Sequence, residues 1–233
     1  MMMRSMWSGM MRFDIITLFP EIIDFFKIGL VGKAQQNNLI QVACWNPRDF
    51  STSPHKQVDD RPYGGEPGMV LQYQPIVDTL NHIKKTHPYS DQDRHIVYLC
   101  PAGKPFNQSM IASFKEKKQF ILIAGRYEGI DQRIIDHHVD SLWSTGPYVL
   151  SGGELPACAI IDALSRSIDG VLGNKASYEN DALSEHYAIK HPVYTRPRII
   201  DGHAVPEALL SGDPKKISQW QDEQRNHNKE KSD

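Results

Sequence analysis

The chain has 233 residues, of which 40% are hydrophobic and 23% charged, and its formal net charge is −2. This length can bury a core without disulfides, and the composition excludes a wholly disordered chain. The near-neutral charge is unlike that of a strongly basic nucleic-acid binder, although it is compatible with a local basic patch. The 3 cysteines form no C-x-x-C pair. This excludes a disulfide framework and a cysteine-rich zinc site, and it favours a reducing cytoplasm.

The sequence predicts no membrane contact, because it has no run of about 18 consecutive apolar residues. Its first ten residues are rich in methionine but lack the apolar centre of a signal peptide, and a regular apolar pattern begins only at Phe13. We therefore interpret residues 1–10 as an extension and expect a cytoplasmic protein.

The first part of the chain predicts a strand, a helix, a second strand and a long loop. Residues 13–18 are an apolar run that ends at a Phe-Pro pair, which is typical of a buried strand leading into a helix. We expect the helix over 21–36, with breaks at its glycines, and the second strand over 40–45. Residues 46–68 are rich in Pro, Ser, Asp, Arg and Gly. Loops of this length in compact domains are usually functional or mobile.

Helices and strands then alternate, which indicates an α/β domain with a mainly parallel sheet. The expected helices cover 75–86, 107–117, 130–137 and 153–168, and the expected strands cover 95–99, 119–124 and 140–144. The strand over 119–124 is continuously apolar, as expected when helices cover both faces of a sheet. The last of these helices has an apolar face that we expect to be buried. That face consists of Leu155, Ala159, Ile160, Ala163, Leu164 and Ile168.

The C-terminal part has a different character. Periodicity fades after Asp169, so we expect the α/β domain at 11–171, a flexible linker at 172–187 and a small helical domain at 188–233. This domain has a short helix that begins at Pro206, and a last helix that runs from Asp213-Pro214 to about residue 225 and is followed by a polar tail.

Three glycine-containing segments each follow a predicted strand, at 99–103, 124–129 and 144–153. Ligands of parallel sheets bind at the carboxyl ends of the strands, so we expect these segments to form one ligand site. Any one of them alone could be an ordinary turn in which glycine supplies a positive φ. The glycine pair at 152–153 opens a helix, whose N-terminus favours an anion. The chain has no P-loop, no dinucleotide-binding glycine motif, no H-E-x-x-H and no G-x-S-x-G motif. We expect no metal site.

Four motifs give the sequence a recognisable pattern. They are DDRPYGGEPGM at 59–69, GRYEGID at 125–131, GPYVLSGGELP at 146–156 and YTRP at 194–197. Together, in this order and spacing, they resemble the bacterial tRNA guanine-N1 methyltransferases, over about residues 12–220. The resemblance implies a SPOUT-class fold, in which the C-terminal part of a mainly parallel sheet forms a deep trefoil knot. It further implies a homodimer with its active site at the subunit interface.

The resemblance also implies the reaction. It is methyl transfer from S-adenosylmethionine to N1 of guanine 37, the base 3′ of the anticodon in tRNA. The matching cofactor-binding residues are Tyr98, Leu99, Pro101, Gly125, Tyr127, Glu128, Ser144, Thr145, Gly146, Tyr148, Val149, Leu150, Gly152, Gly153 and Pro156. The family's catalytic pair falls on Asp181 and Arg166. Without the resemblance, the sequence would suggest that Asp181 is a solvated carboxylate in a linker and that Arg166 is an exposed arginine on a helix.

The two catalytic candidates suit the chemistry of guanine. N1 becomes nucleophilic as its proton leaves, so a carboxylate on N1–H serves as general base, an effect typically worth about 10²–10⁴ in rate. A guanidinium then stabilises the negative charge that develops toward O6. The target base must be unstacked to be reached. The candidate RNA contacts are Arg61, Arg126, Arg133, Arg196 and Arg198.

Two features depart from the family's pattern. Glu66 stands where the loop usually has a third glycine, and the C-terminal module is short, with six Lys or Arg against five Asp or Glu over 186–225. Weakly bound Mg²⁺ is a further cofactor that the sequence neither requires nor excludes. The alternatives are a SPOUT-class methyltransferase for another RNA base, a non-catalytic RNA-binding protein and a generic nucleotide-binding α/β protein.

Overall fold

The computed structural model describes residues 10–114, 116–173 and 191–230, with side chains as far as Arg225 in the last range. The chain divides into two compact units between Gly173 and Asn174. The predicted linker at 172–187 therefore lies largely outside the described residues. Among the described helices, none is both long and apolar enough to cross a membrane.

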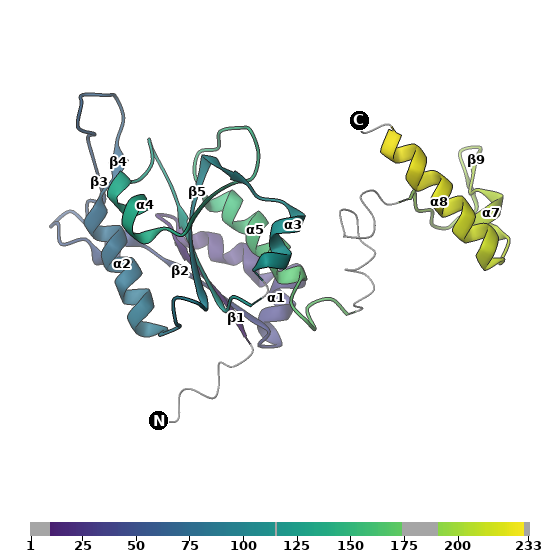
Figure 1. Cartoon of the computed structure of the whole chain (residues 1–233), viewed down its shortest axis with the longest axis horizontal. Coiled ribbons are helices and arrows are strands. Elements are labelled where there is room, and N and C mark those ends of the chain that lie inside the picture. Colours follow the sequence, from purple (N-terminus) through teal and green to yellow (C-terminus); the bar gives the residue numbers. More distant parts are fainter. Residues whose placement is uncertain (1–9, 115, 174–190, 231–233) are drawn as a thin grey trace. The chain divides into compact units, whose positions relative to one another are not determined.

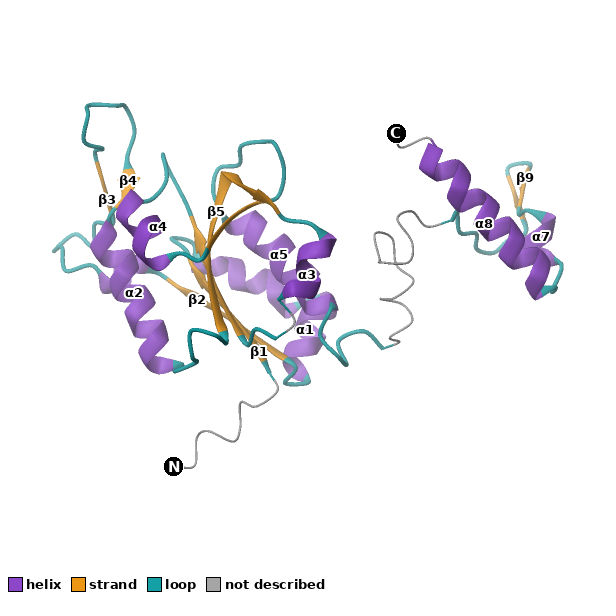
Figure 2. Ribbon diagram, viewed as in Figure 1, coloured by secondary structure: helices purple, strands orange, loops and turns teal. Residues whose placement is uncertain are grey.

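A five-stranded parallel sheet forms the centre of the first unit (Figures 1 and 2). Its strands lie in the order β2 (Ile40–Trp45), β1 (Met11–Ile16), β6 (Gln119–Ala124), β5 (Arg94–Pro105) and β7 (Ser141–Ser144). Every neighbouring pair is parallel. The predicted α/β class with a mainly parallel sheet is thus confirmed, and the knot stays a prediction.

Helices cover both faces of this sheet, as the apolar strands predicted (Figure 1). One face carries α1 (Gly29–Gln36), α3 (Gln108–Ser113) and α5 (Glu154–Arg166), and the other carries α2 (Tyr73–Thr86) and α4 (Gln132–His138). Side chains of β1 alternate between the two cores: Phe13 and Ile15 join the α1–α5 side, and Ile16 joins the α2–α4 side.

Several predicted elements change shape in the structure. The helix expected over 21–36 is a 3₁₀ helix, η1 (Pro20–Lys27), followed by α1, and the break falls at Gly29 with φ +64°. The strand expected over 95–99 continues to Pro105, because residues 100–103 bulge out while Leu99 and Lys104 both pair with Trp143. A short helix, η2 (Pro47–Phe50), and a small hairpin of β3 (Asp59–Asp60) and β4 (Val70–Leu71) interrupt the long loop.

The predicted buried face of α5 is partly wrong. Leu155 is 63% exposed and Ala159 is exposed as well. Nearly every side of this helix carries apolar residues, so periodicity alone does not select the stripe that packs on the sheet. The buried residues of α5 are Glu154, Ala157, Cys158, Ile160, Ile161, Leu164 and Ser165.

The second unit is small and contains a hairpin that the sequence did not predict, made of β8 (Ile199–Ile200) and β9 (His203–Ala204). Two helices follow, α7 (Glu207–Leu210) and α8 (Pro214–Glu230). Asp213 accepts the backbone N–H of Lys215 at 2.9 Å, which is the expected N-terminal cap. The last helix continues past the predicted end at 225.

Candidate active site

The three glycine-containing segments meet at one edge of the sheet. Two of them follow β6 and β7, and the third is the bulge within β5, which lies between these two strands, so all three are neighbours at the carboxyl end of the sheet. Together they line a cavity of about 130 Å³ that is open to solvent. The three segments therefore line one cavity, as the sequence predicts, and ligand binding there stays a prediction.

The cavity is lined by most of the predicted cofactor residues. These are Tyr98, Leu99, Pro101, Gly125, Tyr127, Glu128, Ser144, Thr145, Tyr148, Val149, Leu150, Gly152, Gly153 and Pro156. Five further lining residues were not among the predicted cofactor residues, namely Cys100, Arg126, Gly129, Trp143 and Ser151. All five are sequence neighbours of predicted ones, so a contiguous reading of each loop would have found them.

Gly146 is the predicted residue that does not line the cavity. A Cβ there would lie 2.3 Å from the ring of Tyr148, so this ring covers it. The turn is further held by Ser144, whose hydroxyl donates to the Gly146 carbonyl at 2.9 Å. Gly146 thus lets the loop curl tightly.

The end of the loop after β7 packs closely on the backbone at the end of β6. Gly153 donates its N–H to the Gly125 carbonyl at 3.0 Å, and a Cβ at Gly153 would lie 2.7 Å from the Cα of Ala124. Only glycine fits there without movement of backbone, which explains the glycine at the start of α5.

Tyr98 lines the cavity. A Cβ on Gly125 would lie 2.8 Å from its ring, and one on Gly129 would lie 3.1 Å from its hydroxyl. Burial raises the pKa of Tyr98 to about 12. The phenol therefore stays protonated at neutral pH and serves as a wall and a hydrogen-bond donor rather than as a base.

The loop after β6 is held by the β3–β4 hairpin. Glu128 donates its N–H to the Met69 carbonyl at 3.0 Å, and Leu71 donates to the Gly129 carbonyl at 3.0 Å. Tyr127 adopts φ +57°, a left-handed conformation that is rare for a bulky residue. Such strain is concentrated at functional sites, where the surrounding structure enforces it.

An ion pair closes one side of the site. Arg126, after β6, lies with its NH2 atom 2.9 Å from Oε2 of Glu154, in the first turn of α5. The N-terminus of α5 was expected to favour an external anion. The structure instead places the protein's own Glu154 carboxylate in that first turn, where it interacts favourably with the helix dipole.

Comparison with known proteins identifies the family. Residues 11–232 match the family model described as tRNA (Guanine-1)-methyltransferase TrmD. The chain belongs to the TrmD family. It is 46% identical over 216 residues to the tRNA (guanine-N(1)-)-methyltransferase of Aeromonas hydrophila, a match that covers 92% of this chain and 83% of that one. The tRNA (guanine-N(1)-)-methyltransferase of Coxiella burnetii is 45% identical over 206 residues, a match that covers 88% of this chain and 82% of that one.

A solved structure agrees with this assignment. The crystal structure of the tRNA (m1G37) methyltransferase from Aquifex aeolicus superposes with a TM-score of 0.79 at 36% identity, covering 96% of this chain and 94% of that one. The TrmD-family fold therefore extends over both units of the chain.

The two predicted catalytic residues lie in different parts of the chain. Arg166 is half-buried at the last position of α5. At about 1.5 Å per helical residue, its backbone is about 15 Å along the helix from Pro156, the last cavity-lining residue. Asp181 lies outside the described residues.

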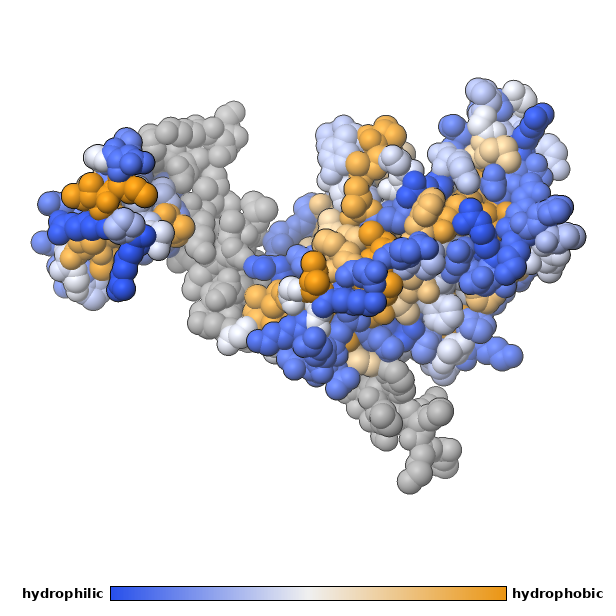
Figure 3. All heavy atoms as spheres, turned by 180° about the vertical axis from the view of Figure 1, so that it is seen from behind, coloured by the Kyte–Doolittle hydropathy of each residue, from blue (hydrophilic) through white to orange (hydrophobic). Residues whose placement is uncertain are grey.

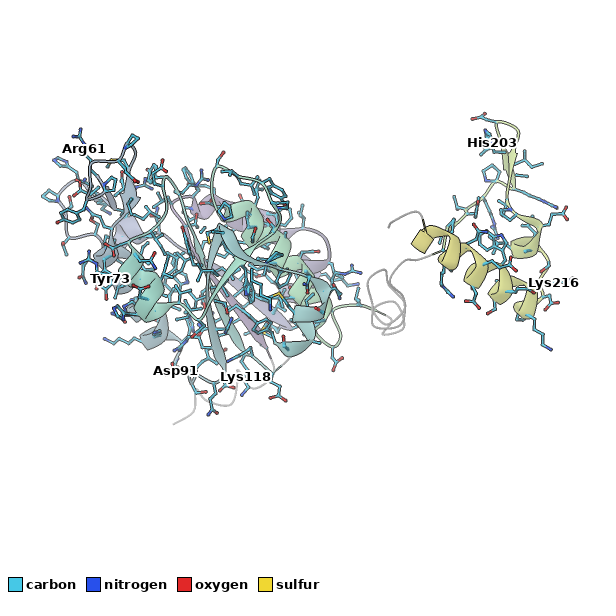
Figure 4. All side chains as sticks on the ribbon, turned by 45° about the horizontal axis from the view of Figure 1, so that its top comes forward. Arg61, Tyr73, Asp91, Lys118, His203 and Lys216 are labelled. Atoms are coloured by element: carbon cyan, nitrogen blue, oxygen red, sulfur yellow. The ribbon has the colours of Figure 1, made fainter. Side chains whose placement is uncertain are left out.

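The predicted RNA contacts fall on both units. Arg61 is exposed at the outer end of the β3–β4 loop (Figure 4), and Arg133 pairs with Asp131 at 2.6 Å. Arg196 and Arg198 are exposed on the second unit. Arg126 is only 24% exposed because it pairs with Glu154. Among the described residues, no group of three or more His, Cys, Asp and Glu side chains is arranged to hold a metal ion.

Proposed function

We propose that this protein transfers the methyl group of S-adenosylmethionine to N1 of guanine 37 in tRNA. The observation that carries the proposal is the cavity at the ends of β5, β6 and β7, lined by TrmD-family motif residues. The coarser assignment, a tRNA guanine-N1 methyltransferase, is supported by the names of relatives that match most of the chain.

The cavity suits a folded nucleoside cofactor. Its glycines let backbone amides and carbonyls approach a flat base, and a Cβ at Gly153 would fill that space. Apolar side chains from Leu99, Leu150 and Pro156 line it alongside polar ones. When bound there, S-adenosylmethionine supplies a methyl group activated by its sulfonium.

The reacting groups follow from the chemistry of the base. We assign Asp181 as the general base that removes the N1 proton of guanine and Arg166 as the donor that stabilises the charge developing toward O6. Once Asp181 holds this proton, the N1 lone pair would be free to accept the methyl group that S-adenosylmethionine would supply when bound.

The position of Arg166 favours an active site built from two chains. Its place at the far end of α5 separates it from the cavity of its own chain by more than its side chain spans. Exposed apolar residues on the neighbouring elements η1 and α5, Phe25, Ile28 and Leu155, offer a surface for a second copy. Figure 3 shows apolar side chains among polar ones on one face of this unit. We therefore assign a homodimer in which one chain supplies Arg166 and Asp181 to its partner's cavity.

The RNA side of the site is assigned to the five arginines. Arg61, Arg126 and Arg133 extend from the cavity-bearing unit, and Arg196 and Arg198 from the small one. Because each phosphate contact releases counterions, tRNA affinity should fall with salt. The second unit holds nine Lys or Arg against ten Asp or Glu, and the first holds 17 against 18, so this attraction depends on where the arginines lie rather than on the net charge of either unit.

The test is transfer of labelled methyl from S-adenosylmethionine to tRNA transcripts with G or A at position 37. Label in the G transcript only, lost in Asp181→Ala, would establish the substrate, the cofactor and the base. Equal label in both transcripts would move the target to another base, the first alternative above. Tight tRNA binding without label or cofactor affinity would identify an RNA-binding protein instead.

A further inference from the structure

Glu154 is a buried carboxylate beside the cavity that the assignments above leave without a role. It is 5% exposed. Its Oε1 accepts hydrogen bonds from the Thr17 hydroxyl at 2.7 Å and from Nε of Arg126 at 3.2 Å. Oε2 lies 2.9 Å from NH2 of Arg126 but has no well-aligned donor. Burying an incompletely satisfied carboxylate costs free energy, so stability alone is a poor explanation for it.

Arg126 connects the Glu154 carboxylate to the loop after β7. It belongs to the loop after β6, and its NH1 donates to the carbonyl of Ser151 in the loop after β7 at 3.1 Å. Its guanidinium also lies 4.4 Å from the centre of the Phe19 ring. The Arg126–Glu154 pair therefore connects two of the three walls of the cavity.

The backbone of the β7 loop is shaped around this pair. A Cβ on Gly152 would lie 2.3 Å from Nε of Arg126 and 2.4 Å from Oε2 of Glu154. Gly152, Arg126 and Ser151 all line the cavity, whereas Glu154 does not. A change at Glu154 would thus reach a bound ligand only through Arg126 and the loop.

We propose that Glu154 is a positioning residue for cofactor binding. Its carboxylate fixes Arg126, and Arg126 holds the loop 144–153 in the arrangement that receives S-adenosylmethionine. A loop that is already ordered before the ligand binds loses less conformational entropy on binding, so the ligand binds more tightly. This inference rests on the proposed function, since it concerns the same cavity.

The first test is Glu154→Gln, which keeps the shape of the side chain and removes its charge. Binding of S-adenosylmethionine to the full chain, without RNA, is measured by titration calorimetry beside thermal unfolding. Loss of one charge-assisted hydrogen bond should raise Kd by about 10- to 100-fold. The protein should remain folded, because Arg126 is 24% exposed and can be solvated without its partner. With saturating cofactor, kcat should change little, while KM for S-adenosylmethionine rises with Kd.

Two further variants make the result specific. Asp93→Asn also removes the carboxylate of an ion pair, since Asp93 lies 2.8 Å from Lys118. This pair lies at the amino ends of β5 and β6, away from the cavity (Figure 4). The Kd of this variant for S-adenosylmethionine should equal that of wild type. The double variant Arg126→Gln/Glu154→Gln should bind no more weakly than Arg126→Gln alone, because the two side chains act as one unit.

The inference is overturned if Glu154→Gln binds the cofactor as wild type does, or if it lowers Tm while Kd of the folded protein is unchanged. It is also overturned if Arg126→Gln raises only KM for tRNA, because Arg126 would then contact RNA without holding the wall of the cofactor cavity. Failure of the wild-type chain to bind S-adenosylmethionine would refute the proposed function and the inference together.

Discussion

Two adjacent glycines of the candidate active site have different neighbours, so substitution by alanine should have different effects at the two positions. A Cβ on Gly153 would meet the backbone of Ala124 at 2.7 Å, whereas one on Gly152 would meet only side-chain atoms, those of Arg126 and Glu154. We expect Gly153→Ala to destabilise the fold by about 1–3 kcal/mol, as overpacking typically does. Gly152→Ala should leave Tm within a few degrees but weaken cofactor binding. Thermal unfolding and titration calorimetry measure the two effects, and an equal loss of Tm in both variants would contradict this distinction.

At the scale of the element, a buried carboxylate on β1 connects this strand to its two neighbours, β2 and β6. Asp14 is fully buried and accepts hydrogen bonds from Arg12 of its own strand, Trp45 of β2 and Gln119 of β6. Asp14→Asn leaves the buried Arg12 without an anion, so we expect a loss of about 3–5 kcal/mol of unfolding free energy. Chemical denaturation measures it. The pair replacement Arg12→Met/Asp14→Leu should cost less, and a larger loss in the double variant would refute this account.

A histidine of β5, His95, gives the stability of the fold a predictable dependence on pH. Burial lowers the pKa of His95, although Asp140 opposes the shift. The unfolded chain therefore binds a proton at a pH where folded His95 stays neutral, so stability should fall as pH drops below 6.5. Thermal unfolding at a series of pH values checks this.

The matched variant for this prediction is His95→Phe, which keeps ring packing on Phe114 and Trp143. It should flatten the pH curve between the lowered folded pKa and 6.5. His87 and His138 also have lowered pKa values, so a smaller slope should remain. A slope identical to that of wild type would exclude His95 as the cause.

The elements also show how far sequence reasoning reaches. The strands at 40–45 and 119–124 were predicted to the residue because apolar runs between polar neighbours define them. The buried face of α5 was not predicted correctly. The helix has more than one apolar face, and the sequence alone does not show which of them packs on the sheet. The meeting of the three glycine-containing segments at one cavity was predicted because chain order fixes where strands end. The Arg126–Glu154 pair was not predicted, because it depends on the distance between a loop and the first turn of a helix.

At the scale of the whole molecule, the prediction concerns which chain completes each active site. Arg166 lies about 15 Å along α5 from the nearest cavity-lining residue of its own helix. If the partner supplies Arg166 and Asp181, two inactive variants should restore each other. One variant is Leu150→Arg, which places a cation in the cavity against the sulfonium, and the other is Asp181→Ala. Each alone should transfer no methyl group.

When the two variants are co-expressed, half of the dimers contain one chain of each kind. Every such dimer has one site with an intact cavity from one chain and an intact Asp181 from the other. Activity should therefore return to about a quarter of the wild-type value in a C₂ dimer. Methyl transfer to the G37 transcript measures it, and co-expression of Leu150→Arg with Thr145→Arg, both cavity changes, is the control that should stay inactive. Should the mixture stay inactive while forming mixed dimers, each chain must use its own Asp181, and the half-buried Arg166 would act only within its own subunit.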